Sequence, residues 1–266
     1  MKNLILFLIP FTIFAQENCN YFKMMGDNQK YEACIMYEDL SAKGYYQFQK
    51  EWMEGLDKIL EKHPDYAKAH HEKSIPYLKS GDFVNWKINI DKAVKYDAEN
   101  YLGFRGSVKA KFFGDNIGAI ADIDSLDKIR DYDLGMTNNG DYHLNIVKAI
   151  CYSQLDQKEK AIEIFEKQLA DETHTIGLYD YYQLGVTYFE IKSYEKALQE
   201  FQKQLTENEN AETHYYLGQI YKNLNQQEKY FQHKEKAIDF YKKGIIMRDP
   251  YNEHINKVYL ETIHKN

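Results

Sequence analysis

The sequence predicts an all-α protein built from pairs of helices stacked one after another. Apolar residues recur with helical spacing along almost the whole chain, and no convincing alternation of apolar and polar residues marks a sheet. The 266 residues include only 4 Pro and 14 Gly, which favours long helices with few sharp turns. Similar helical pairs also return along the sequence, and such a period is typical of a repeat protein.

The composition excludes several classes of protein. With 44% hydrophobic and 28% charged residues, the chain has the proportions of a folded soluble protein rather than a disordered one. Its formal net charge is −7 and it has no basic run, so neither nucleic acid nor an anionic membrane surface is expected as a partner. The 24 tyrosines supply large amphipathic side chains for contacts between helices.

Residues 1–15 have the pattern of a secretory signal peptide. A short positive start precedes an uncharged run over residues 4–14, which is too short to span a hydrocarbon layer of ~30 Å. Ala15 suits the position before a cleavage, so we predict cleavage between Ala15 and Gln16. An uncleaved N-terminal anchor is the competing interpretation. We expect a periplasmic or secreted protein of a Gram-negative bacterium, without a stable membrane span after cleavage.

Export changes the interpretation of the three cysteines. Cys19 and Cys34 lie near the new N-terminus, and a disulfide closing such a loop would contribute about 3 kcal/mol. Spacing alone does not show that the geometry fits, so a disulfide and two free thiols both stay open. Cys151 lies in an apolar helical run and is expected to be a buried, unreactive thiol.

A recurring motif identifies the helical pairs most clearly. It consists of Tyr181-x2-Leu184-Gly185-x2-Tyr188 with Ala197-x3-Phe201, and then of His214-x2-Leu217-Gly218-x2-Tyr221 with Ala237-x3-Tyr241. This pattern resembles the tetratricopeptide repeat (TPR), which has an aromatic residue, Leu-Gly and Tyr on a first helix and Ala and an aromatic residue on a second. The resemblance implies a right-handed superhelical solenoid.

The motif also has a packing explanation. The glycine of the first helix, at 185 or 218, should let the partner helix approach closely, because it carries no Cβ. Ala197 is the matching small residue on the partner helix, and Phe201 follows one turn later on the same face. Glycine inside a helix costs roughly 0.5–1 kcal/mol relative to alanine, so its return at the same place indicates a structural role.

Weaker copies precede these two, and together they predict five repeats over residues 67–250. The small-residue position of the second helix is occupied in turn by Trp86, Ala119, Ala161, Ala197 and Ala237. Residues 16–66 are expected to form an N-terminal helical segment, with a degenerate first repeat as one interpretation. Residues 251–266 are predicted to form a capping helix, with Ile255, Val258 and Ile263 on one stripe.

Two insertions interrupt the regular spacing. Residues 131–141 form a long connection with a turn signal at Asn138-Asn139-Gly140, and we expect this loop to border the binding surface. Residues 225–236 are expected to lengthen the helices of the last repeat or the joint between them.

No catalytic motif is found. The sequence contains no Gly-rich phosphate loop, no Gly-x-Ser-x-Gly, no His-Glu-x-x-His and no Cys-x-x-Cys. The nine histidines are scattered, and no metal site or cofactor is expected. No catalytic residue is nominated, and the protein is not expected to be an enzyme.

The resemblance implies a concave groove, lined by the first helices, that binds peptides or protein segments. Its residues would be His143, Ile146, Tyr179, Tyr182, Val186, Phe189, Glu190, Tyr215, Gln219, Lys222 and Asn223. The alternative is that several of these simply pack between neighbouring repeats or against an insertion.

The leading functional hypothesis is a non-enzymatic scaffold or adaptor of the cell envelope that binds protein or peptide partners. A structural subunit of an envelope assembly is the second hypothesis. A small-ligand binder or an enzyme with an unrecognised site is the third.

Overall fold

The computed structural model describes residues 18–265. The predicted signal peptide and its cleavage site lie outside the described residues. Within them the chain forms fourteen helices, and strand pairing is limited to an isolated bridge between Met136 and His143. The prediction of an all-α helical repeat solenoid is confirmed.

The chain divides into two compact units, which meet in the sequence between residues 96 and 97. The described part of the first unit contains α1 (Cys19–Met24), α2 (Asn28–Ser41), α3 (Lys50–Lys62), α4 (Ala67–Ser80) and α5 (Phe83–Tyr96). Cys19 at the start of α1 and Cys34 in α2 form a disulfide, with their Cα atoms 5.5 Å apart. Both cysteines belong to a core that α3 completes with Trp52, Leu56 and Ile59.

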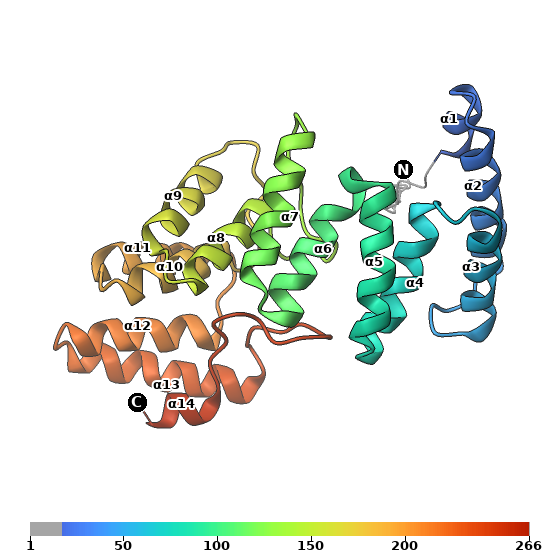
Figure 1. Ribbon diagram of the computed structural model, residues 1–266. Helices are drawn as coiled ribbons and strands as arrows, with labels where there is room; N and C mark the ends of the chain where they lie inside the picture. The colour runs from blue at the N-terminus through green and yellow to red at the C-terminus, as the bar shows by residue number, and fades with distance from the viewer. Residues whose placement is uncertain (1–17, 266) are drawn as a thin grey trace, which may run out of the picture. The chain divides into compact units, whose positions relative to one another are not determined.

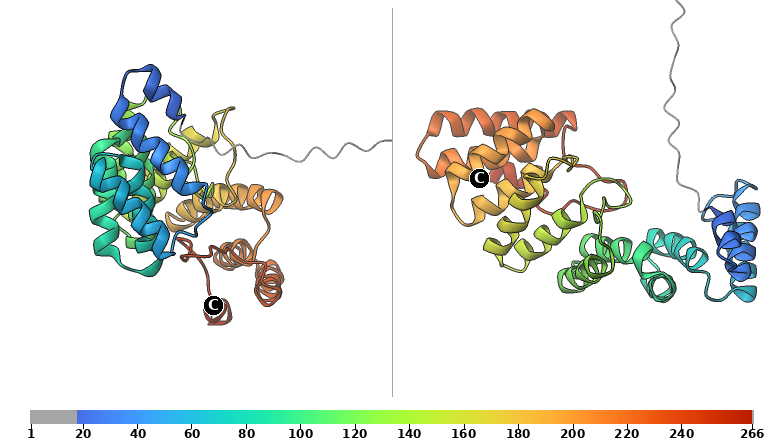
Figure 2. Two further views of the ribbon diagram at one scale, coloured as in Figure 1. Left: turned by 90° about the vertical axis from the view of Figure 1, so that its right-hand side faces the viewer. Right: turned by 90° about the horizontal axis from the view of Figure 1, so that it is seen from above.

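The second unit contains four helical pairs and a short last helix. Its elements are α6 (Ala98–Phe113), α7 (Asn116–Ile129), α8 (Leu144–Gln154), α9 (Lys158–Leu169), α10 (Asp180–Glu190), α11 (Tyr194–Glu207), α12 (Ala211–Asn223), α13 (Gln227–Lys243) and α14 (Leu260–Lys265). Figures 1 and 2 show the two helices of each pair lying side by side. The first helices α8, α10 and α12 also contact their neighbours in the series.

Each of the five predicted repeats turns between its helices in the same way. The residue two positions before the second helix has a positive φ, and it is Gly81, Gly114, Asp156, Lys192 or Asn225. The following N–H then bonds to a carbonyl of the first helix, as Ser193 does to Tyr188, which is a Schellman-type ending. In α6 this bond runs from Asp115 to Lys109, one residue further back than in the other repeats. The end of the first helix in the second repeat thus contains one more residue than in the other repeats.

The second helices bury the predicted small-residue positions. Ala119, Ala161, Ala197 and Ala237 are fully buried, and the equivalent Trp86 is almost so. The two motif glycines differ, however. A Cβ on Gly185 would lie 2.8 Å from the ring of Phe201, whereas a Cβ on Gly218 would have its nearest neighbour at 3.6 Å. Only Gly185 therefore permits a close approach that alanine would block.

The C-terminal region differs from the predicted capping helix. Residues 245–259, called the C-terminal segment below, form neither helix nor strand, and α14 begins only at Leu260. Pro250 cannot donate a backbone hydrogen bond, and Asn256 has a φ of 63°, so both positions disfavour a continuous helix. The insertion at 225–236 takes a simpler form, because it lengthens α13 to 17 residues against 14 in α11.

Candidate functional site

The first helices of the second unit are covered on one face by the C-terminal segment. Figure 1 shows this segment as the long orange-to-red connection between α13 and α14. It reaches Lys111 of α6, where Asn252 Nδ2 donates to the main-chain carbonyl, and Gln154 of α8, whose Nε2 lies 3.3 Å from Asn256 Oδ1. It also contacts α10 and α12. The face of the first helices that the repeat pattern predicts as a groove, called the groove below, is thus in contact with a non-helical piece of the same chain.

Three buried polar side chains bind the main chain of this segment, and they are called the polar row below. On α10, Tyr182 Oη donates to the Asn256 carbonyl at 2.5 Å and Gln183 Nε2 donates to the Ile255 carbonyl at 3.0 Å. On α12, both carboxylate oxygens of Glu212 accept from the Met247 N–H at 3.1 Å. All three side chains are at most 1% exposed. Because the segment forms no ladder of its own, these contacts satisfy part of its backbone.

Burial controls the protonation of Glu212. Removal from water raises the pKa of this carboxyl to about 7, although the Met247 N–H partly opposes the shift. The carboxyl therefore changes its charge near neutral pH while it holds the segment.

Side chains of the segment make further contacts with the groove. Lys111 Nζ lies 2.6 Å from Asp249 of the segment and 2.7 Å from Asp141 of the 131–141 loop. Burial lowers the pKa of Lys111, but the hydrogen bonds to the two carboxylates outweigh it and raise the pKa above its usual value. The ring of His254 packs against Tyr179, with ring centroids 4.8 Å apart.

The 131–141 loop borders a cavity beside this groove. The cavity has a volume of about 350 Å³ and is lined by residues 139–141, by Leu178 and Tyr179, and by residues 248–251 and His254 of the C-terminal segment. The loop thus lies next to the groove, as the sequence analysis expects.

Some of the predicted groove residues are buried. These are His143, Ile146, Tyr179, Tyr182 and Val186, each at most 6% exposed. Tyr182 and Tyr179 touch the C-terminal segment, as described above. His143 instead caps α8, because its Nδ1 accepts from the Asn145 N–H and its Nε2 pairs with Asp133 at 2.9 Å.

The other predicted groove residues lie in α10 and α12, and all of them except Tyr215 are in the C-terminal half of their helix. Phe189, Tyr215 and Gln219 are half-buried, and Glu190, Lys222 and Asn223 are exposed. The Phe189 ring packs on Tyr216 with centroids 5.2 Å apart, and Glu190 pairs with Lys158. This end of the groove surface is accessible to a partner.

Sequence reasoning missed Gln183 and Glu212 as groove residues. Gln183 occupies an unspecified position between the motif residues Tyr181 and Leu184, and Glu212 lies two residues before His214. A polar residue at such a position is usually placed on a solvated face. The signal that could have found them is the unusual C-terminal sequence Asp249-Pro250, which disfavours a helix and leaves backbone groups in need of partners.

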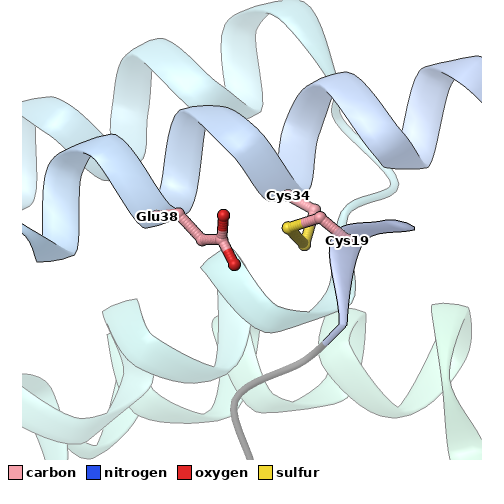
Figure 3. A group of neighbouring side chains, drawn as sticks. All are labelled: Cys19, Cys34 and Glu38. Atoms are coloured by element: carbon pink, nitrogen blue, oxygen red, sulfur yellow. A yellow bond between two sulfur atoms is a disulfide. The ribbon is translucent and has the colours of Figure 1, made fainter. Parts of the chain in front are cut away.

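Cys19, Cys34 and Glu38 form a small cluster in the first unit (Figure 3). Both sulfur atoms take part in the S–S bond. The cluster therefore offers no thiolate to a metal ion, and it is a structural crosslink beside an exposed carboxylate.

Among residues 18–265, every helix is too short or too polar to cross a bilayer.

The fold is a helical-repeat solenoid in which first helices of the second unit contact the C-terminal segment of the same chain. The tetratricopeptide repeat family model matches residues 142–170 and 181–210, which contain the pairs α8/α9 and α10/α11. Residues 142–170 and 181–210 therefore carry tetratricopeptide repeats, and the described part of the chain has an all-α helical-repeat fold.

Solved structures share this fold at low sequence identity. Pseudomonas aeruginosa pilF has 14% identity and a TM-score of 0.59, with 82% of this chain and 93% of that chain covered. PilW, a widely conserved type IV pilus biogenesis factor, has 14% identity and a TM-score of 0.60, with 80% and 94% covered. YrrB, a TPR protein with an unusual peptide-binding site, has 18% identity and a TM-score of 0.53, with 71% and 93% covered. No curated protein matches the chain.

Proposed function

We propose that this chain is a non-enzymatic scaffold of the cell envelope that is exported through its N-terminal signal and holds extended segments of partner proteins in its concave groove. The observation that carries the proposal is the polar row. Tyr182, Gln183 and Glu212 bind main-chain groups of a non-helical segment, so the groove has the chemistry to bind the main chain of a polypeptide.

The comparisons support the same proposal. Stacked helical repeats present extended concave surfaces suited to binding. One structural neighbour is a pilus biogenesis factor and another carries a peptide-binding site, and both agree with an envelope scaffold that binds polypeptide. The predicted signal peptide supports export.

A site-specific photo-crosslinking experiment tests the groove. A photoreactive amino acid replaces Glu190, the exposed last residue of α10. As a control, the same amino acid replaces Glu163, which is exposed on the second helix α9. We expect a defined partner to crosslink at Glu190 and not at Glu163. Substituting Lys222 and Asn223 by alanine should lower the yield. Equal crosslinking from both positions, or none from Glu190, would contradict the groove function.

Export is tested separately by fractionation and N-terminal sequencing of the mature protein. We expect an envelope protein that begins at Gln16. If the protein is found in the cytoplasm and its sequence still begins at Met1, the proposed location is wrong.

A further inference from the structure

The C-terminal segment occupies the groove that the proposed function assigns to a partner. We propose that residues 245–259 are a displaceable internal ligand, a proposal that rests on the function proposed above. A partner peptide of the same chemistry then binds the polar row after this segment leaves. The matching peptide is non-helical and carries an apolar anchor, an acidic residue and an imidazole or amide group. These correspond to Met247, Asp249 and His254 with Asn256.

The first argument is the polarity of the buried contact. Tyr182, Gln183 and Glu212 are buried, and each bonds to the main chain of the segment. Gln183 also donates to the Tyr142 hydroxyl and accepts from the Asn256 side chain. Burying polar groups carries a desolvation penalty, and a permanently filled interface is often at least as stable with apolar residues. Polar groups can instead bond to water or to a second peptide once the segment leaves.

The segment is anchored at separate positions, between which large apolar side chains stay exposed. Met247, His254 and Val258 are buried, but Ile245, Tyr251 and Tyr259 are 41–53% exposed. Segments with few buried contacts and no regular hydrogen-bond ladder open at lower free energy than packed helices. The segment can therefore leave while the helical pairs stay folded.

Both ends of the segment are attached to α13, and its ion pair with Lys111 is shared with a second carboxylate. Gly244, with a φ of 73°, ends α13 just before the segment, and Val258 and Ile263 pack back on Ala237 of α13. Both ends are thus attached to the same helix, so the segment can lift as a loop. When Asp249 leaves, Lys111 keeps its ion pair with Asp141, so no buried charge loses its last partner.

The test measures binding of a labelled synthetic peptide with the sequence of residues 244–259 to the mature chain, by fluorescence anisotropy. The apparent affinity is reduced by the fraction of molecules whose groove is open, so weakening the internal segment should tighten binding of the peptide. Met247→Ala with Asn256→Ala weakens the segment and leaves every residue of the groove intact. We expect at least about tenfold tighter binding than for the wild type.

Two controls make the result specific. Ile245→Ala truncates an exposed apolar side chain of the same segment and should change the affinity less than about twofold. Adding Tyr182→Phe to the weakened variant removes one hydroxyl from the polar row and should lose at least about threefold of the gained affinity. A peptide of the same composition in scrambled order should bind weakly to every variant.

Peptide binding tests displacement of the segment, whereas crosslinking from Glu190 tests whether the groove binds a partner protein. A weakened variant that stays folded and binds the peptide no better than wild type overturns displacement, and the crosslink from Glu190 then decides the function alone. Tight peptide binding without any crosslinked partner supports displacement and rejects the scaffold role.

If the weakened variant does not fold, hydrogen exchange of the wild type decides. We expect the Met247 amide to exchange at least about 100-fold faster than the amides in the middle of α12. Equal protection of the segment and of α12 would show that the segment is a permanent part of the core.

Discussion

The two motif glycines offer a direct test of the packing described for the repeats. Gly185→Ala and Gly218→Ala make the same chemical change at equivalent positions of consecutive repeats. The sequence motif predicts that both glycines are needed for close helix approach. The structure predicts that only the first one is.

The distances give the expected magnitudes. A Cβ on Gly185 would lie 2.8–3.0 Å from three ring atoms of Phe201, and this ring is fully buried and stacked on Tyr216. Overpacking of this kind costs roughly 1–3 kcal/mol, and the higher helix propensity of alanine returns roughly 0.5–1 kcal/mol. Gly185→Ala should therefore lower the free energy of unfolding, by up to about 2.5 kcal/mol. At Gly218 the nearest atoms are at 3.6 Å, so alanine should raise it by roughly 0.5–1 kcal/mol.

Urea unfolding followed by circular dichroism measures both effects, with thermal melts as a second assay. For a unit of this size each kcal/mol corresponds to about 2–4 °C in Tm. The two variants should move in opposite directions from wild type. If Gly218→Ala destabilises the protein as much as Gly185→Ala does, the reasoning from Cβ distances is wrong.

Three further predictions concern the cysteines and Glu212. Cys19→Ser with Cys34→Ser should lower the free energy of unfolding of the first unit by about 3 kcal/mol, as measured by denaturation with and without reductant, since the disulfide closes a separation of 15 residues. Burial raises the pKa of the Cys151 thiol to about 12, so this thiol should react with a thiol reagent only after unfolding, and one thiol per unreduced chain should be found. Burial raises the pKa of Glu212 from 4.5 to about 7, so the folded state retains a proton that the unfolded chain releases. Stability from this group is therefore complete below pH 4.5 and is lost as the pH rises through 7, by at most roughly 3 kcal/mol, and thermal melts of Glu212→Gln should lack this slope.

The repeat pattern predicted the helical pairs well because each pair is specified locally. The glycine, the aromatic residues and the small residue of a repeat lie within a few turns of one another, and the turn between helices depends on one residue with a positive φ. Even the non-glycine turn residues Asp156, Lys192 and Asn225 occupy the same position as Gly81 and Gly114.

The occupied groove could not be predicted in the same way. Its contacts join residues more than seventy positions apart, as in the bonds from Tyr182 and Gln183 to residues 255–256. The stripe of Ile255, Val258 and Ile263 resembles an amphipathic helix, but only Val258 and Ile263 reach the core contact with α13. Helical periodicity therefore predicted part of the packing correctly, but the helix that it predicted over residues 251–259 is wrong.

The same contacts explain why Tyr182 is a poor choice for testing the groove by truncation. Its ring is fully buried and contacts Phe201 and Tyr216, so Tyr182→Ala would leave a large cavity and destabilise the repeat whether or not the groove binds a partner. Tyr182→Phe keeps the ring and removes only the hydroxyl that bonds to Asn256. A loss of peptide affinity in this variant, with unchanged helical content, would report the groove contact itself, because the packing of the repeat is preserved.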